Sequence, residues 1–521
     1  MNRENGMMFA KTCWQRGTRV AALVLALSGL SACGGQSDNQ KFGNGGTGGT
    51  GNGDTVPYTT GVYPDYKSLA NQCSSAAAEN NFLRSWINDT YLWYREVPDL
   101  DPNRTADPLD YFDQLKTPAT TTSGADKDKF HFTYDTDVWE QLSQSGVSAG
   151  YGAQWILLSA VPPRDVRVAY VDPATPASSQ GIQRGDKVIA VDGADAINGD
   201  TQAIVDTLNE GLFPENLNET HEITLETAAG TQYTATLVSQ NITSTPVQST
   251  HVVNTGTKMV GYMLFNDHIA TAESQLITAV TTLRDAGVNE LVLDIRYNGG
   301  GYLYIASELA YMIAGPAATN GKTFEELTFN DKYPTKDPIT GDTLEPVPFL
   351  PTDSNNAALP TLNLNRVFVI TGSGTCSASE SIINSLRGVN VTVVQIGGTT
   401  CGKPYGFYPQ DNCGTTYFAI QFKGVNDAGF GDYSDGFSPG NTTTAAGTSV
   451  VGCSVVDDFD HALGDEAEGR YAAALQYMAT GSCPTAPPGV VEKLRSGNRI
   501  VDGFMVKSPL RENRILGGRL R

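Results

Sequence analysis

Residues 366–388 read RVFVITGSGTCSASESIINSLRG, and this stretch predicts a buried strand, a glycine-containing turn and a helix in direct succession. A second unit of the same kind lies upstream, where the apolar run ELVLDI (290–295) is followed by the turn RYNGGGY and by the helical stretch LYIASELAYMIAG. Residues 269–286 predict a further helix, and 391–396 a further strand. Repeated β-turn-α units predict an α/β core with functional residues at the carboxyl ends of its strands.

The turn at residues 371–377 contains several candidate nucleophiles, of which Ser377 is favoured. A serine hydroxyl has a pKa far above 7, so it needs a base to remove its proton and N–H donors to bind the oxyanion that follows. At a strand-to-helix turn the first helical residue projects its side chain outward, the next backbone N–H points at whatever lies there, and the helix dipole adds positive potential. Ser377 is expected to be that first helical residue. Cys376 is the rival, but a free reactive thiol would be short-lived in an oxidising compartment. Ser379 and Ser381 fall within the expected helix, where hydroxyls commonly bond back to the preceding turn.

Three motifs resemble those of the carboxyl-terminal processing (tail-specific) serine proteases, in the same order along the chain. The stretch Asp-Ile-Arg-Tyr-Asn-Gly-Gly-Gly at 294–301 resembles the family motif whose glycines supply an oxyanion N–H. The Ser-Ala-Ser-Glu sequence at 377–380 resembles the motif whose first serine is the nucleophile, and the Gly-Lys turn at 402–403 resembles the motif that carries the general base. The resemblance covers roughly residues 145–480. It implies a dyad of Ser377 and Lys403, with oxyanion donors from Ala378 and from Gly300 or Gly301.

The surroundings of Lys403 also fit a base. A lysine acts as a base near neutral pH only if desolvation lowers its pKa from about 10.4 toward 7 to 8. The neighbouring sequence TTCGKPYGFYP is rich in aromatic residues, and Asp411 is the carboxylate that follows most closely. One departure is Phe407, which stands where the family usually has a glutamine that orients the lysine. Gln410 is a candidate for that role, or the enzyme uses the dyad alone; Glu380 is expected to stabilise the helix start or tie the loop.

Two further regions precede this core. Residues 66–135 predict a small N-terminal helical domain, because ENNFLRSWINDTYLWYREV (79–97) and LDYFDQLK (109–116) have apolar residues at helical spacing. Residues 146–243 are β-rich, and the pattern from Pro176 to Gly193 resembles a PDZ domain. That resemblance implies a domain that binds the C-terminal end of a peptide by strand pairing, with Gly150-Tyr151-Gly152 as its carboxylate-binding loop. The catalytic core is expected over 250–485, and a basic C-terminal tail over 486–521.

The N-terminal 32 residues are typical of a secretory signal peptide, with a basic lead and an apolar run too short to span a bilayer. The sequence Leu30-Ser31-Ala32-Cys33 resembles the bacterial lipobox, which implies that Cys33 carries lipid. The Gly-rich residues 33–60 are then a flexible tether. Because Gly34 rather than Asp follows the cysteine, the expected location is the outer membrane, facing the periplasm or the cell surface.

Composition limits the number of domains and the kinds of partner and cofactor that are expected. The chain has 521 residues, so several domains are expected, and its net charge of -21 argues against a nucleic-acid partner. The five histidines are scattered and the cysteine spacing matches no zinc pattern, so neither a metal nor another cofactor is expected.

With Cys13 in the signal and Cys33 lipidated, six cysteines remain, which predicts disulfides. The first choice is Cys401 with Cys413; Cys401 with Cys376 is the alternative, which would join the two catalytic loops.

These observations together predict an exported, multidomain α/β serine endopeptidase that cleaves protein substrates through an acyl-enzyme. The alternative is a catalytically inactive lipoprotein that binds peptides through its PDZ-like domain, an interpretation that the missing glutamine at position 407 supports. Labelling of Ser377 by a fluorophosphonate or a boronate would distinguish the two.

Overall fold

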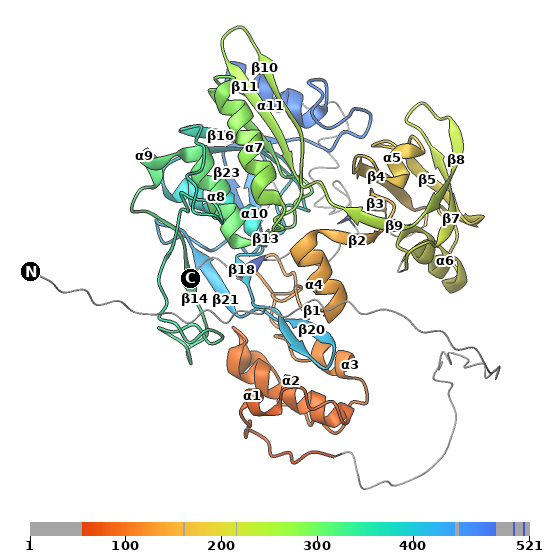
Figure 1. Cartoon of the computed structure of the whole chain (residues 1–521), viewed down its shortest axis with the longest axis vertical. Coiled ribbons are helices and arrows are strands. Elements are labelled where there is room, and N and C mark those ends of the chain that lie inside the picture. The colour runs from red at the N-terminus through yellow and green to blue at the C-terminus, as the bar shows by residue number, and fades with distance from the viewer. Residues whose placement is uncertain are drawn as a thin grey trace, which may run out of the picture. The chain divides into compact units, whose positions relative to one another are not determined.

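The computed structural model describes residues 55–159, 162–214, 216–442 and 447–485, together with the short strands at 504–505 and 514–515 (Figure 1). The predicted signal peptide, Cys33, most of the tether and most of the basic tail lie outside these residues. Within the described part, no helix combines the length and apolar character needed to cross a membrane.

The predicted α/β core is built on a six-stranded sheet. Its strand order is β10-β11-β12-β16-β17-β24, and every neighbouring pair is parallel except the antiparallel pair β10 and β11. The strands are β10 (Val247–Asn254), β11 (Met259–Phe265), β12 (Glu290–Asp294), β16 (Arg366–Thr371), β17 (Thr392–Gly397) and β24 (Gly452–Ser454). Strand β12 is buried along its whole length, as expected for a parallel strand covered on both faces.

Helices cover both faces of this sheet. Alternate residues of β11, Met263 and Phe265, pack in one cluster with α7 (Ala272–Asp285), α8 (Leu303–Ala314) and α10 (Ala378–Gly388). The intervening residues Tyr262 and Leu264 pack in a second cluster with α11 (Gly469–Thr480) on the other face. The period of two along the strand thus divides the core into two layers. The expected helices at 269–286 and 377–387 correspond to α7 and α10.

The N-terminal segment is mainly helical but also contributes a strand. It contains α1 (Tyr66–Leu69), α2 (Ala76–Thr90), η1 (Tyr94–Glu96), α3 (Pro108–Asp113), β1 (Phe132–Asp135) and α4 (Thr136–Ser145). Strand β1 pairs antiparallel with β20 (Thr415–Phe418), which pairs with β19 (Gln410–Asn412). Trp86 and Phe112 share one apolar cluster with Phe407 and Phe418, so this segment is packed directly onto the chain that follows Lys403.

The β-rich segment forms a sheet of its own. It comprises β2 (Val147–Gly150), β3 (Ala153–Ser159), β4 (Asp165–Val171), α5 (Pro176–Ser179), β5 (Lys187–Val191), β6 (Ala194–Asp195), α6 (Gln202–Leu212), β7 (Thr220–Glu226), β8 (Gln232–Val238) and β9 (Gln240–Thr243). The order in the sheet is β25-β3-β4-β5-β7-β8, where β25 (Phe504–Met505) pairs antiparallel with β3. Strands β2 and β9 pair with each other at the two ends of the segment.

Short elements complete the core. A four-stranded sheet has the order β15-β14-β21-β18 and is formed by β14 (Thr323–Thr328), β15 (Val347–Pro348), β18 (Tyr405–Gly406) and β21 (Phe422–Val425). Strand β13 (Gly301–Tyr302) pairs parallel with β26 (Arg514–Ile515), and β22 (Phe437–Pro439) pairs parallel with β23 (Thr448–Val450). Helix α9 (Pro316–Thr319) follows α8 directly.

The disulfide pairing differs from the first expectation. The bonds are Cys73–Cys413, Cys376–Cys401 and Cys453–Cys483. The predicted Cys401–Cys413 bond is therefore wrong, and the alternative partner of Cys401 is the observed one. The reason is tertiary: Cys413 lies at the turn between β19 and β20, where the N-terminal segment brings Cys73 to within 5.6 Å between Cα atoms.

Candidate active site

Ser377 lies between the end of β16 and the start of α10, in an unusual backbone conformation. Its φ and ψ are 56° and -114°, and it is the N-cap residue rather than the first residue of the helix. A non-glycine residue at positive φ costs on the order of 1 to 3 kcal/mol and persists only where neighbouring contacts hold it. One such contact is the Ser377 N–H, which donates to Glu380 Oε2 at 3.0 Å.

The turn before Ser377 is bonded to the turn that follows β12. The Cys376 N–H and the Ser379 hydroxyl both donate to the carbonyl oxygen of Asn298, at 3.1 and 2.9 Å. The Thr375 hydroxyl donates to the carbonyl of Ile295 at 2.8 Å. The two glycine-containing turns predicted at neighbouring strand ends therefore lie together. Ser379 does not bond back to its own helix as expected, because this second turn offers it an acceptor.

The two candidate oxyanion glycines differ in their contacts. The Gly300 N–H donates to Asn298 Oδ1 at 3.0 Å, so it is already engaged in holding its own turn. Gly301 has φ of 133°, and a Cβ built there would come within 2.5 Å of the His268 carbonyl oxygen, so only glycine fits. Gly301 in turn lies in β13, which pairs with β26, so the candidate oxyanion donors are the N–H of Ala378 and that of Gly300 or Gly301.

His268 also belongs to this site, although it lies in none of the sequence motifs. It is fully buried, and its Nδ1 lies 2.9 Å from Asn298 Oδ1, the same oxygen that accepts from Gly300. Burial lowers the pKa of His268 to about 3, although the contact with Asn298 opposes that shift. The neutral ring donates from Nδ1 and helps to fix the Asn298 side chain. Its position just after the carboxyl end of β11 was the signal that could have identified it.

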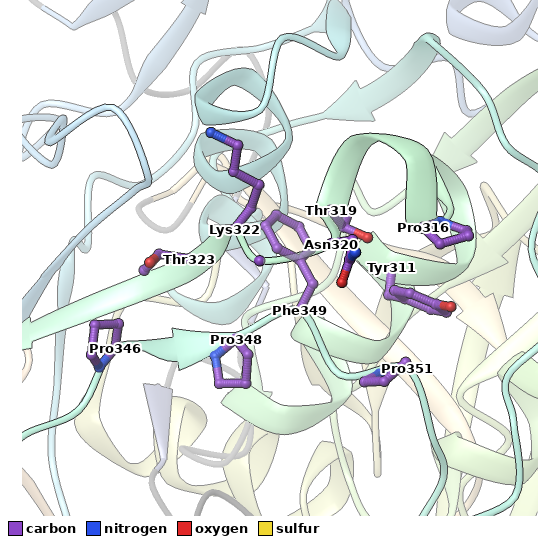
Figure 2. Close-up of a pocket in the computed structure, with 11 residues that line it drawn as sticks. Tyr311, Pro316, Thr319, Asn320, Lys322, Thr323, Pro346, Pro348, Phe349 and Pro351 are labelled. Carbon is purple, nitrogen blue, oxygen red and sulfur yellow. The ribbon is translucent and has the colours of Figure 1, made fainter.

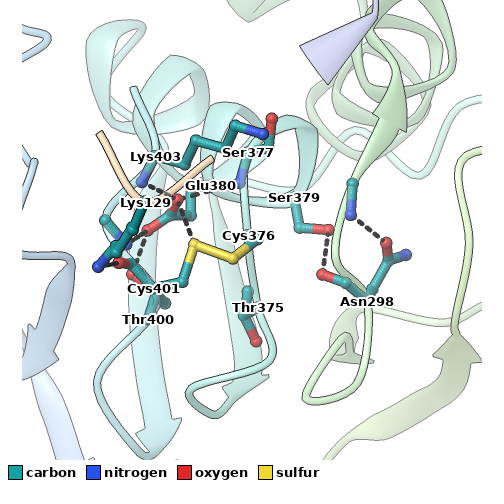
Figure 3. The surroundings of a disulfide bond; sticks show 12 residues. Lys129, Asn298, Thr375, Cys376, Ser377, Ser379, Glu380, Thr400, Cys401 and Lys403 are labelled. Carbon is teal, nitrogen blue, oxygen red and sulfur yellow. Dashed lines mark hydrogen bonds between the residues drawn. A yellow bond between two sulfur atoms is a disulfide. The ribbon is translucent and has the colours of Figure 1, made fainter. Parts of the chain in front are cut away.

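Lys403 is fully buried beside the nucleophile turn. Its Nζ lies 4.6 Å from the ring centroid of Phe130 and 4.7 Å from that of Phe407. Figure 3 shows the amine end of Lys403 pointing toward the Ser377 side chain. Phe407, noted as a departure from the family, is therefore a direct neighbour of the amine. Phe130 comes from the N-terminal segment, and no local pattern in the sequence connects it with Lys403.

Glu380 ties the nucleophile turn to the loop that carries Lys403. In addition to the Ser377 N–H, its carboxylate accepts the N–H of Gly402 at 2.9 Å, the N–H of Lys403 at 2.8 Å and the Thr400 hydroxyl. Burial raises the pKa of Glu380, and these hydrogen bonds oppose that rise. The contacts agree with the expected role of holding the loop.

The positions of Gln410, the candidate for orienting the base, and of Cys376, the rival nucleophile, do not favour these roles. The Gln410 side-chain amide donates to the carbonyl of Asp411 at 3.0 Å in a solvent-exposed setting on β19, which does not favour an orienting role at Lys403. Cys376 is bonded to Cys401, so it is not a free thiol and is excluded as the nucleophile in this structure. Lys129, the neighbour of Phe130, donates from Nζ to the Cys401 carbonyl at 3.0 Å (Figure 3).

The predicted peptide-binding loop lies at the start of β3. Tyr151 is buried, its hydroxyl donates to the Gly211 carbonyl at 3.1 Å, and its own carbonyl accepts the N–H of Ala177 at 2.9 Å. Gly152 has φ of 81°, and a Cβ there would come within 2.4 Å of the Thr175 side chain. The loop is thus held between α5 and α6, next to the edge of the sheet on which β25 pairs.

A buried ion network joins the β-rich segment to the loops around the candidate site. Arg184 donates to Asp457 Oδ1 at 2.8 Å and to the Tyr297 hydroxyl at 2.6 Å, while Arg296 donates to Asp457 at 2.7 Å and to Glu468 at 2.7 Å. Burial alone would raise the pKa of Asp457, but the neighbouring guanidinium groups hold it well below its usual range. Tyr297 directly precedes Asn298, so the network reaches the oxyanion turn.

A separate pocket of about 450 Å³ lies between α8, α9 and the β14–β15 pair (Figure 2). Prolines and aromatic rings supply much of its lining, which includes none of the candidate catalytic residues. No group of three or more histidine, cysteine or acidic side chains in the described residues is arranged to hold a metal ion.

Comparison with known proteins shows which peptidases this chain is similar to. Residues 259–407 match the model of peptidase family S41, and residues 78–134 match the peptidase S41 N-terminal domain. Two curated relatives are carboxyl-terminal-processing proteases. One, from a Picosynechococcus species, is 29% identical over 33% of this chain and 39% of its own length. The other, from a Synechocystis species, is 25% identical over 44% of this chain and 47% of its own length. The chain thus matches less than half the length of either relative.

A solved structure supports the fold. A Bacteroides fragilis protein assigned to the S41 proteases has a TM-score of 0.58 and 23% identity, over 77% of this chain and 97% of that protein. At this identity the likeness concerns the fold alone. Together with the family matches, it confirms the mixed α/β architecture and the resemblance to the carboxyl-terminal processing proteases.

Proposed function

We propose that this chain, whose residues 78–134 and 259–407 match peptidase family S41, is an exported serine endopeptidase of the carboxyl-terminal processing type. Ser377 attacks the substrate carbonyl, Lys403 accepts the serine proton and later donates it to the leaving amine, and water hydrolyses the acyl-enzyme. The N–H of Ala378 and that of Gly300 or Gly301 bind the oxyanion. The observation that carries the proposal is the buried Lys403 amine directed at the positive-φ serine.

The aromatic rings around Lys403 support a role as general base. Burial disfavours the charged form of an amine, which leaves it available to take a proton. When the amine becomes an ammonium during the reaction, the faces of Phe130 and Phe407 attract it. The same two rings thus keep the neutral Lys403 amine away from water and attract its ammonium form, and this arrangement does not need the glutamine that is usual in the family.

The β-rich segment is proposed to be a PDZ domain that binds the C-terminal end of the substrate. A PDZ domain receives its peptide as an added strand on the edge of its sheet, beside a glycine-containing loop. The edge of β3 already pairs with the short strand β25, which supports the view that this edge accepts an extended chain. The substrates are then proteins with an accessible C-terminus, and lipidation at Cys33 would hold the enzyme on the outer membrane.

The test uses the purified chain without its signal peptide and a set of peptides with free C-termini. Ser377→Ala and Lys403→Ala should each reduce cleavage to background while the circular dichroism spectrum stays unchanged. The matched control Lys423→Ala removes an exposed lysine of β21 and should leave cleavage intact. A boronate should label the unmodified chain at Ser377. The proposal is refuted if the unmodified chain neither cleaves any peptide nor reacts at Ser377, and the inactive peptide-binding alternative then holds if peptides still bind.

A further inference from the structure

The Cys376–Cys401 disulfide, called here the active-site disulfide, joins the two loops that carry the proposed catalytic residues (Figure 3). Cys376 directly precedes Ser377, and Cys401 lies two residues before Lys403. Their Cα atoms are 5.2 Å apart, although the sequence separation is 25 residues and includes α10 and β17. A short covalent path therefore connects the nucleophile to the base.

Two more disulfides are found among the described residues, and both lie elsewhere in the fold. Cys453 of β24 is bonded to Cys483, which follows α11, so that bond holds α11 to the edge of the central sheet. Cys73 precedes α2 and is bonded to Cys413 at the turn between β19 and β20. Neither bond joins the two loops of the candidate site, which makes both of them matched controls for the active-site disulfide.

The loop that carries Lys403 also has non-covalent anchors. Residues 398–404 form no helix or strand. The Cys401 N–H donates to the Thr375 carbonyl at 3.0 Å, Lys129 Nζ donates to the Cys401 carbonyl, and Glu380 accepts from the next two N–H groups. These bonds keep the loop close to α10 without the disulfide. Opening the disulfide is therefore expected to loosen the position of Lys403 rather than to unfold the core.

We propose that the active-site disulfide positions Lys403 against Ser377, so that the peptidase is fully active only when this bond is formed. The inference rests on the proposed function of the same two residues. A dithiol reductant breaks the S–S bond, gives two cysteine thiols and becomes a cyclic disulfide, so electrons and protons balance. Cys401 is half-buried and Cys376 is buried, so attack occurs at the Cys401 sulfur and Cys376 leaves as the thiolate.

Small displacements matter at this site because proton transfer needs hydrogen-bond reach between base and nucleophile. A shift of about 1 Å in a catalytic group can cost about 100-fold in rate. The proposed substrate-binding edge, β3 of the PDZ-like segment, does not contain the active-site disulfide, so substrate binding there should not depend on this bond. Loss of the bond should therefore lower kcat and leave KM close to its original value.

The test compares four chains. They are the unmodified chain, Cys376→Ala/Cys401→Ala, the control Cys453→Ala/Cys483→Ala, and a chain that keeps only the active-site disulfide because its other four bonded cysteines are replaced by alanine. For each chain, kcat, KM, the rate of Ser377 labelling by a boronate and the Tm are measured before and after treatment with dithiothreitol.

We expect Cys376→Ala/Cys401→Ala to lose about 10- to 100-fold in kcat and in labelling rate, with little change in KM. The control pair should lower Tm without lowering kcat. Dithiothreitol should lower kcat in the chain that keeps only the active-site disulfide, reoxidation should restore it, and the chain without that bond should not respond.

The inference is overturned if Cys376→Ala/Cys401→Ala keeps the original kcat, or if dithiothreitol acts equally on chains with and without the bond. If that variant does not fold, reversible reduction of the chain that keeps only the active-site disulfide decides the same question. Failure of the unmodified, oxidised chain to cleave peptides or to react at Ser377 would instead refute the proposed function, so the two failures are distinguishable.

Discussion

Phe407 contacts Lys403 through its ring, with 4.7 Å between Nζ and the ring centroid, and Phe130 contacts the amine in the same way. An amide would orient the amine by a hydrogen bond, whereas a ring attracts the ammonium through its electron-rich face and has no acceptor atom. Position 407 thus provides electrostatic attraction and apolar packing at one residue, and Phe130 adds a second ring from a distant part of the chain.

We expect Phe407→Leu to lower kcat by roughly tenfold or more, because a desolvated cation–π contact contributes about 2 kcal/mol and leucine keeps the apolar volume without the ring. Phe418→Leu is the matched control, since Phe418 packs against Phe407 with ring centroids 5.2 Å apart in the same buried cluster. Both variants should lose similar thermal stability, but only Phe407→Leu should lose turnover. Equal kcat values for the two would show that the ring has no part in catalysis.

At the scale of elements, the amino-terminal end of α10 and the loop between β17 and β18 meet at one carboxylate. Glu380 lies in the first turn of α10, and its oxygens accept from Ser377, Gly402 and Lys403. A negative charge at the start of a helix interacts favourably with the helix dipole. The same carboxylate also accepts backbone N–H groups of the loop that carries Lys403, which has no helix or strand to hold it. The position of Lys403 therefore depends on α10 as well as on its own loop.

We expect Glu380→Gln to lower both the free energy of unfolding, by about 3 kcal/mol, and kcat, because the amide NH₂ would face backbone N–H groups that then lose their acceptor. The control Glu326→Gln changes an exposed carboxylate of β14 and should have little effect. Urea unfolding and peptide cleavage measure the two quantities. Unchanged kcat in a destabilised Glu380→Gln chain would show that the carboxylate stabilises the fold without positioning the base.

At the scale of the whole molecule, Arg184 connects the β-rich segment to the loops around the candidate site through Asp457 and Tyr297. Arg184 and Asp457 are nearly inaccessible to solvent, with exposed side-chain fractions of 6% and 1%. Removing one member of a buried ion pair leaves the other charge uncompensated, which usually costs more than an exposed pair contributes.

We expect Arg184→Met to lower the free energy of unfolding by about 3 kcal/mol, whereas Arg284→Met, which breaks an exposed pair with Asp285, should change it little.

Because the pKa of Asp457 lies below its usual value, the network stabilises the fold at neutral pH, and this stability is lost as the pH falls through the lowered pKa. Urea unfolding at neutral and at acidic pH should therefore show the difference between Arg184→Met and the unmodified chain shrinking in acid. A difference independent of pH would contradict this account.

Short-range patterns in the sequence were enough to predict the α/β core and the turns that carry the candidate site residues. The helices at 269–286 and 377–387 and the strands at 290–295 and 391–396 follow from apolar periodicity and glycine stops, which act within one element. The serine and the lysine were found because each lies in a short motif at a strand end. These features depend only on residues that are close together in the chain, so they can be predicted from a single sequence.

Tertiary structure alone decided which distant residues complete the site. Phe130 meets Lys403, Cys73 pairs with Cys413, and Arg184 meets Asp457 across long sequence separations. Six cysteines allow fifteen pairings, and no local spacing distinguishes them. The cost of closing a loop changes only slowly with its length, so sequence separation does not select a partner. The packing of the N-terminal helices and the β-rich segment onto the core selects it, and that packing is a property of the folded chain.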